Sequence, residues 1–257
     1  MPARWSPNFD VYRAVVDDRP AVFLVDLAAA EYAPLDTHPI RLQIRVKLSS
    51  AREDGLRDAG EADAINALED AMVQRLEARI DAVYVGRFTN AGHTVFVFYF
   101  PATHAEEVRA SLDVMVGELP HGYQPEWLTD EDADWEYYVE FLAPDMFAHQ
   151  QIENRRLLDE LVSQGDLLDS IRTVDHLAFF PDEDSATRAA EALAEAGFEV
   201  DAPDGPGEDG RFSLEFHRTE QLADGRPDEF TAEVLELVLP LDAEYDGWAT
   251  IVVRGDA

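Results

Sequence analysis

The sequence predicts an α+β protein made of two ferredoxin-like units, each with the order βαββαβ and each forming an antiparallel sheet with helices on one face. Two observations lead to this prediction. The hydrophobic period switches repeatedly between two residues, typical of a half-buried strand, and about 3.6 residues, typical of an amphipathic helix. The same succession of short strands and helices then occurs twice, before and after Pro144, with one extra leading strand in the first unit. We therefore expect one domain at 1–143 and a second at 144–257.

The first unit shows strand and helix patterns in alternation. Ala21 to Leu27 is an apolar run, and from Ile40 to Leu48 aliphatic residues alternate with polar ones. Asn90 to Gly92 provides turn residues between two strand-like segments and predicts a hairpin. The expected elements are strands at 21–27 and 40–48, a helix at 61–80, hairpin strands at 83–88 and 94–100, a helix at 105–119 and a closing strand at 135–141.

The second unit starts with a leucine-containing helical segment that ends at Gly165. The glycine-rich stretch from Asp204 to Gly210 lies between two strand-like runs and predicts a hairpin tip. The expected elements are a helix at 147–164, a strand at 173–180, a helix at 185–196, strands at 198–201 and 211–218, a helix at 228–239 and a strand at 247–253. The identity between the halves is too low for a sequence repeat, so we interpret them as a duplication of architecture.

The chain is strongly acidic, with 54 Asp and Glu against 20 Lys and Arg in 257 residues and a net charge of -34. The second unit is the more acidic, with 28 acids and 8 bases against 26 and 12 in the first. Binding nucleic acid through its phosphates needs clustered basic side chains, so we expect no direct nucleic-acid binding. The charge instead favours a basic protein surface as partner, although it is equally compatible with solubility or adaptation to high salt.

The largest concentration of positive charge is Arg41, Arg45 and Lys47, which alternation places on one strand face. We favour cross-strand pairing with acids such as Asp26 or Glu140 over a contact with an anion or a partner.

Several classes of function are excluded. The chain has no cysteine, so disulfides and thiolate chemistry are absent. It shows neither a signal-peptide pattern nor an apolar run of about 18 residues, so we expect a cytoplasmic protein that does not contact a membrane. No metal, nucleotide or hydrolase motif occurs, and we expect no cofactor and no enzymatic activity.

Two short stretches contain large side chains with polar groups, which cost free energy to bury unless they are hydrogen-bonded. His176 lies in phase with Val174 and Ala178 in an apolar strand, which favours a hydrogen-bonded core histidine over a contact residue. Trp248 follows the turn residues Asp246 and Gly247, and we favour a core position over an interface anchor. If the last strand begins at Gly247, its start should lie beside 179–181 and far from Asp175 and His176.

These stretches are part of a longer segment that resembles a known protein family. The segments LLDELVSQGDLLDSIRTVDHLAFF, EALAEAGFEV and AEYDGWAT, within about 154–253, resemble the RraB family, regulators of ribonuclease E activity. The front unit, with AVFLVDLAAAEY, IRLQIRVKL, LEDAMVQRLE and AVYVGRFTNAGHTVFVFYF, is similar to an uncharacterised domain often fused ahead of an RraB-like one.

The resemblance implies a non-enzymatic, acidic cytoplasmic protein of ferredoxin-like fold that binds ribonuclease E, or another basic polypeptide, and restrains RNA cleavage. Two alternatives stay open: a front domain that binds a ligand or catalyses a reaction, with the RraB-like domain as a structural appendage, and a structural or stress protein. The candidate partner-binding residues are Asp175, His176, Tyr245, Asp246, Gly247 and Trp248.

Overall fold

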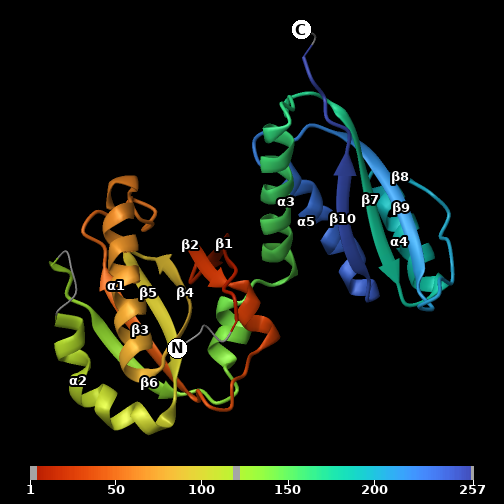
Figure 1. The fold of residues 1–257 in the computed structure, drawn as a ribbon. Coiled ribbons are helices and arrows are strands. Elements are labelled where there is room, and N and C mark those ends of the chain that lie inside the picture. Colours follow the sequence, from red (N-terminus) through yellow and green to blue (C-terminus); the bar gives the residue numbers. More distant parts are fainter. Residues whose placement is uncertain (1–4, 118–121, 256–257) are drawn as a thin grey trace. The chain divides into compact units, whose positions relative to one another are not determined.

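The computed structural model describes residues 5–117 and 122–255, and the chain forms two compact units, Met1–Ala148 and His149–Ala257 (Figure 1). Each unit contains one antiparallel sheet, with six strands in the first unit and four in the second. The prediction of an α+β protein with two antiparallel sheets is confirmed. The division between the units falls in the first turn of α3 (Met146–Ser163), five residues beyond the expected boundary at 143.

The first unit has the strand order β1-β2-β4-β5-β3-β6. Its elements are β1 (Phe9–Val16), β2 (Arg19–Asp26), β3 (Ile40–Lys47), α1 (Ala62–Ile80), β4 (Val83–Asn90), β5 (His93–Phe100), α2 (Ala105–Gly117) and β6 (Glu126–Glu131). Helices α1 and α2 cover one face of the sheet, and the predicted stripe of α1 from Ile65 to Ile80 is buried there. The predicted end of the second helix at Leu119 lies outside the described residues.

The predicted closing strand at 135–141 is wrong. These residues form a helical turn with π-type hydrogen bonding at Tyr137–Leu142, and β6 closes the sheet against β3 instead. Two causes override the strand propensity of the aromatic run. The Asp132 carboxylate accepts hydrogen bonds from the backbone N–H groups of Glu136 and Tyr137, at 2.8 and 3.2 Å, as a helix cap does. Trp135, Tyr138 and Leu142 are all buried, and their spacing of three and four is helical.

Strand β1 was not predicted, because Tyr12 is its only fully buried residue and its hydrophobic alternation is therefore weak. It pairs with β2 along its whole length, from Phe9 opposite Asp26 to Val16 opposite Arg19.

The basic residues of β3 differ in their contacts. Arg41 pairs with Asp130 at 2.9 Å and with Asp132 at 3.4 Å, and its guanidinium lies over the Tyr137 ring. Pairing with acids on a neighbouring strand was expected, but the partners are Asp130 on β6 and Asp132 directly after it, rather than Asp26 or Glu140. Arg45 and Lys47 are exposed.

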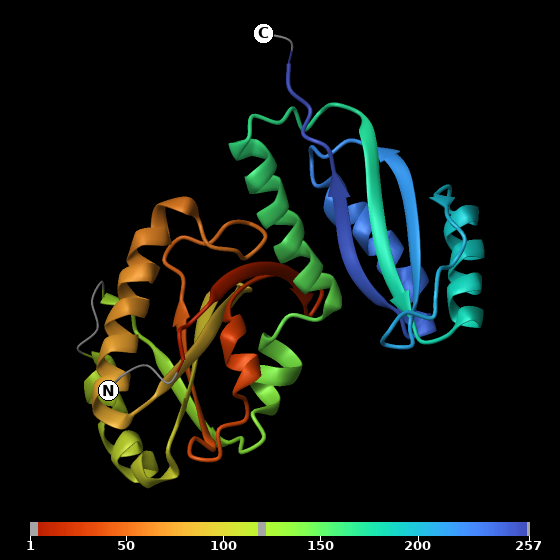
Figure 2. The ribbon, with the colours of Figure 1, turned by 45° about the vertical axis from the view of Figure 1, so that its right-hand side comes forward.

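The second unit has the strand order β10-β7-β9-β8, all antiparallel. Its elements after α3 are β7 (Arg172–Phe180), α4 (Glu183–Glu195), β8 (Glu199–Val200), β9 (Phe212–Glu220), α5 (Arg226–Val238) and β10 (Glu244–Thr250). Every second residue of β7, from Arg172 to Phe180, is buried. Helices α4 and α5 both pack on that face, and α3 packs against Val174 and Trp248 there as well, so within the described residues the opposite face of the sheet carries no helix of this unit (Figures 1 and 2).

The expected separation of the two conspicuous stretches is wrong. Strand β10 starts at Glu244, and an irregularity at Asp246 shifts the register between Tyr245 and Gly247. Trp248 therefore lies opposite His176, and Ala249 lies opposite Asp175. The earlier start and the extra residue in the bulge move the tryptophan along β7.

The two units share one topology despite their different sizes. From β3 to β6 the first unit has the succession βαββαβ with the order β6-β3-β5-β4. The second unit has the same succession with the order β10-β7-β9-β8. The hairpin β1-β2 is added to the β4 edge of the first sheet, so the duplicated architecture carries one extension.

Candidate partner-binding surface

The candidate residues surround a buried histidine in the second unit. His176 is 3% exposed, and its Nδ1 lies 2.7 Å from the Tyr245 hydroxyl. Its ring stacks on Phe216 at 5.1 Å and meets Phe198 and Phe230 edge-on. Burial, with a smaller effect of the positive charge of Arg218, lowers the pKa of His176 to about 3. The ring is therefore neutral at pH 7, as a hydrogen-bonded core histidine should be.

Trp248 is held in the core by a polar side chain of α3. The indole Nε1–H donates to the Asn154 Oδ1 at 2.8 Å, and the ring meets Phe230 edge-on. Asn154 is 1% exposed, and both the oxygen and the nitrogen of its side-chain amide make two hydrogen bonds. Its Oδ1 also accepts from Gln150, and its Nδ2 donates to Asp228 and Thr231, at 2.9, 2.8 and 2.9 Å. One asparagine thus joins α3 to β10 and α5.

A second buried polar contact lies at the start of β7. The Arg172 guanidinium and the Asp166 carboxylate form an ion pair at 2.6 Å, and both side chains are buried. Asp166 also accepts the backbone N–H of Val253 at 2.8 Å. Burial opposes ionisation of Asp166, but the hydrogen bonds from Arg172 and Val253 outweigh it and hold the pKa of this carboxyl below its usual value.

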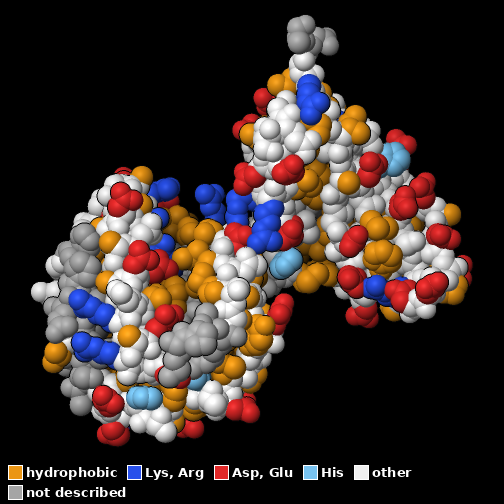
Figure 3. Space-filling model, in the orientation of Figure 1, with side chains coloured by type: hydrophobic (Ala, Val, Ile, Leu, Met, Phe, Trp, Pro, Cys, Tyr) orange, Lys and Arg blue, Asp and Glu red, His pale blue; other side chains and the backbone are white. Residues whose placement is uncertain are grey.

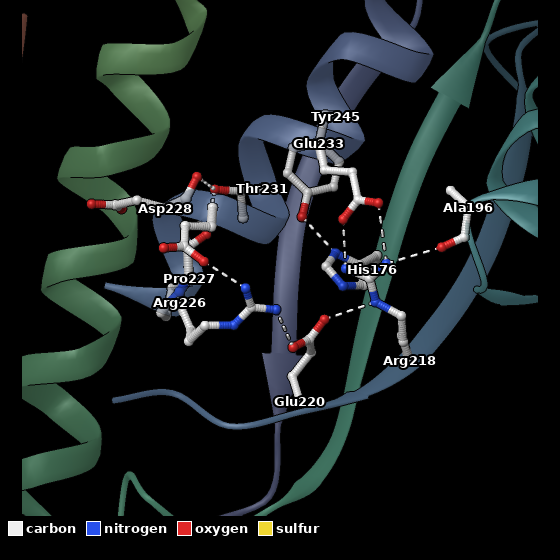
Figure 4. A network of polar contacts seen from close by, with 11 residues as sticks. His176, Ala196, Arg218, Glu220, Arg226, Pro227, Asp228, Thr231, Glu233 and Tyr245 are labelled. Atoms are coloured by element: carbon white, nitrogen blue, oxygen red, sulfur yellow. Dashed lines mark hydrogen bonds and ion pairs between the residues drawn. The ribbon is translucent and has the colours of Figure 1, made fainter. Parts of the chain in front are cut away.

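An ionic chain links β9 to α5 beside the histidine (Figure 4). Arg218 lies over the Phe198 ring at 4.0 Å and pairs with Glu220 and Glu233, each at 2.7 Å. Glu220 pairs in turn with Arg226 at 2.8 Å. Carboxylates on both sides satisfy Arg218, so we assign it a structural role.

Most residues of the sequence motif therefore support the fold from inside. His176, Tyr245 and Trp248 are buried and close together, whereas Asp175 and Asp246 are exposed and Gly247 is half-buried. Gly247 follows the bulge with a φ of 104°, a conformation that favours glycine. The candidates with exposed side chains are thus Asp175 and Asp246.

Asn154, Arg218 and Glu220 were missed as structural residues by sequence reasoning. Asn154 had a detectable signal, because it precedes Leu157, Leu158 and Leu161 by three, four and seven positions on the buried stripe of α3. A polar residue at such a position requires a partner. Arg218 and Glu220 had no such signal, since their partners are distant along the chain.

Asp175 belongs to an acidic face formed by the side of the sheet opposite α4 and α5, which we call the open sheet face. Register places Ala249, Asp175, His217 and Glu199 side by side across the four strands. Gly247, Leu177 and Glu215 form the next row, and Glu244, Phe179 and Ser213 the one after it. Its exposed carboxylates are Asp175, Glu199, Glu215 and Glu244. Figure 3, in the orientation of Figure 1, shows acidic and hydrophobic side chains over these strands.

One guanidinium already lies on this face. Arg211 is placed over the Phe179 ring, 5.0 Å from its centroid, and pairs with Asp209 and Glu244. The open sheet face can therefore hold an arginine by combining an aromatic ring with carboxylates.

Within the described residues, no group of three or more His, Cys, Asp or Glu side chains is arranged to hold a metal ion. In the same part of the chain, no helix is both long enough and apolar enough to cross a membrane.

The geometry defines a class: a small α+β domain with a hydrophobic core that contains hydrogen-bonded polar side chains and with an acidic sheet face, in one chain with a second α+β unit. Comparison with protein families agrees with this division. Residues 7–143 match the family of unknown function DUF695, and residues 151–250 match the family described as regulator of ribonuclease activity B, RraB. The chain belongs to the DUF695 family and carries a C-terminal RraB domain.

The chain was also compared with curated proteins and with solved structures. No curated protein matches the chain. A structure described as a glycine cleavage system transcriptional repressor is 8% identical, with coverage of 83% of this chain and 98% of that one and a TM-score of 0.25. A protein of unknown function from Galdieria sulphuraria is 11% identical, with coverage of 84% and 99% and a TM-score of 0.22. A microcompartment protein from Desulfitobacterium hafniense DCB is 13% identical, with coverage of 84% and 96% and a TM-score of 0.22.

Proposed function

We propose that this chain is a non-enzymatic cytoplasmic regulator that binds ribonuclease E, or a related RNA-processing nuclease, and restrains RNA cleavage. The contact is made by the open sheet face of the second unit with a basic segment of the nuclease. The observation that carries the proposal is the presence of this acidic face on a domain of the RraB family.

The chemistry of the face suits an arginine-rich segment. Asp175 and Glu215 are exposed on neighbouring strands, and Leu177 lies between them on the same side of the sheet. A guanidinium can bind a carboxylate through two hydrogen bonds while its flat surface covers an apolar side chain. Arg211 makes a related contact within the unit: it lies over Phe179 and donates one hydrogen bond each to Asp209 and Glu244. Asp246 extends the acidic surface at the β10 edge, whereas His176, Tyr245 and Trp248 hold the strands in place.

Charge reversal on the face tests the proposal. In Asp175→Lys/Glu215→Lys, two carboxylates of the open sheet face become ammonium groups, so repulsion replaces attraction toward a basic partner. We expect binding to ribonuclease E to weaken by about tenfold or more. Cleavage of a single-stranded RNA by the nuclease should then resist inhibition by this variant.

The matched control is Glu191→Lys/Glu195→Lys, which makes the same charge change at exposed positions of α4, on the other side of the sheet. This control should inhibit cleavage as the wild type does. Equal loss of inhibition in both variants would show that only net charge matters, and absence of binding by the wild type would reject ribonuclease E as the partner.

A further inference from the structure

The first unit contains a cavity of about 430 Å³ that is lined by four arginines, Arg13, Arg52, Arg57 and Arg87. The only acidic residue in its lining is Asp54. This concentration of positive charge contrasts with a chain whose net charge is -34. The size is within the range of pockets that bind small molecules.

The floor of the cavity is the part of this sheet face that lies beyond α1 and α2. The core beneath α1 and α2 contains buried side chains of β3, β4 and β5 but, within the described residues, none of β1 or β2. The hairpin β1-β2 extends the sheet beyond those helices, and register aligns Val11, Leu24 and Arg87 in one row across the three strands. The floor is thus apolar with an arginine at its inner end.

The wall is the loop that follows β3 and carries Arg52 and Arg57. This loop is fixed to the β4-β5 turn, because the backbone N–H of Gly92 donates to the Gly55 carbonyl at 2.8 Å. Gly55 has a φ of 81°, and a Cβ there would come within 2.9 Å of the Ala91 Cα. Only glycine permits this approach, so the two arginines are held on a preorganised support.

Two of the guanidiniums converge on one oxygen. Arg87 Nη2 donates to the Asn66 Oδ1 at 3.0 Å, and Arg57 Nη1 approaches the same atom at 3.5 Å. Arg87 also pairs with Glu69 at 3.1 Å, and both of these side chains are 13% exposed. Glu69 thus pairs with Arg87 and Asp54 pairs with Arg52, whereas Arg57 donates to the Ala62 carbonyl and the Asn66 Oδ1.

The electrostatic surroundings of Arg57 contain charges of both signs. Burial and, next, the positive charge of Arg87 lower the pKa of Arg57, and they outweigh the negative charges of Glu69, Glu61 and Asp63, which raise it. Two like charges that lie close together in a partly buried site destabilise each other, and an anion placed between them would relieve this repulsion.

We propose that this cavity binds a small organic anion, with its phosphate or carboxylate group held by Arg57 and Arg87 and an apolar body lying over Val22 and Leu24. Arg13 and Arg52 attract the anion at the exposed side. The site belongs to the first unit and is independent of the regulatory contact proposed for the second.

Calorimetric titration of the full chain with phenyl phosphate, benzoate and inorganic phosphate tests the proposal. Phenyl phosphate and benzoate join an anionic head to an apolar ring, so at least one of them should bind with a saturable isotherm, and the tighter one identifies the head group. Inorganic phosphate, without the ring, should bind more weakly than phenyl phosphate. Benzamide, which has the ring but no charge, should not bind.

Two variants locate the site. Arg57→Gln should weaken binding of the tighter probe by about tenfold or more, because a charge-assisted hydrogen bond is lost. The control Arg45→Gln removes an exposed charge that does not line the cavity and should bind as the wild type does. Val22→Phe fills the space above the floor and should weaken phenyl phosphate more than inorganic phosphate. Far-UV circular dichroism establishes that each variant is folded.

The proposal is overturned if neither phenyl phosphate nor benzoate binds the wild type by about 10 mM. It is also overturned if Arg57→Gln and Arg45→Gln weaken binding equally, which would indicate nonspecific attraction.

Discussion

At the scale of the residue, His176 makes the stability of the second unit depend on pH. Its pKa is lowered to about 3 in the folded protein, whereas a histidine in an unfolded chain titrates near 6.5. Between these values the unfolded state binds a proton that the folded state does not, so the free energy of unfolding falls as the pH falls. From pH 7 to pH 5 this residue should remove roughly 2 kcal/mol of stability.

His176→Gln should lose that contribution, which is measured as the difference between urea midpoints at pH 7 and pH 5. The exposed His149 of α3 provides the control, and His149→Gln should keep the wild-type difference. Protonation of carboxylates also changes the stability between pH 7 and pH 5. This change is common to all three proteins, so it cancels when their pH differences are compared. Identical pH differences in the wild type and His176→Gln would show that His176 is not a buried neutral histidine.

At the scale of the element, the attachment of α3 to the sheet depends on the contact between Trp248 and Asn154. Trp248 is 9% exposed and packs with Leu161, Val174 and Phe230. Trp248→Ala should lower the free energy of unfolding by about 3 to 5 kcal/mol, since it leaves a large cavity. Trp248→Phe should cost less, because the Asn154 Oδ1 still accepts from Gln150.

Urea unfolding with hydrogen exchange of the β7 peptide measures this effect in the second unit alone. Val162→Ala is a suitable control, because Val162 lies on the exposed side of α3 with 55% of its surface accessible. An unchanged midpoint in Trp248→Ala, together with weaker partner binding, would instead make Trp248 an interface anchor.

At the scale of the whole molecule, the net charge of -34 predicts how partner binding depends on salt. The Debye length shrinks from about 10 Å at 0.1 M salt to about 3 Å at 1 M, so exposed charges attract one another less. The affinity for the basic partner should fall by about tenfold or more between roughly 50 and 500 mM salt. A gel shift with the same RNA and this chain alone should show no binding, because the acidic surface repels phosphate.

The charge-reversal variant of the open sheet face distinguishes a specific contact from general electrostatic attraction. Asp175→Lys/Glu215→Lys changes the net charge by four units out of 34, so general attraction should survive it. If the variant binds with wild-type affinity and wild-type salt dependence, the acidic charge serves only solubility. Tight RNA binding by the wild type would contradict the argument from charge.

The order of elements follows from the sequence alone wherever the hydrophobic period is regular. The alternation from Arg172 to Phe180 and the stripe from Ile65 to Ile80 predicted β7 and α1, and the repeated succession predicted two antiparallel sheets. The burial of His176 also followed from its phase in β7. These properties are local, since each residue's neighbours along the chain define which face it occupies.

Properties that depend on residues far apart in the sequence are set by tertiary packing. The aromatic run after Asp132 is helical because a buried surface and a capping carboxylate outweigh its strand propensity. The bulge at Asp246 set the register that brings Trp248 opposite His176. Arg13, Arg57 and Arg87 meet around one cavity because three strands and a loop converge there, and no periodicity along the chain encodes such a meeting.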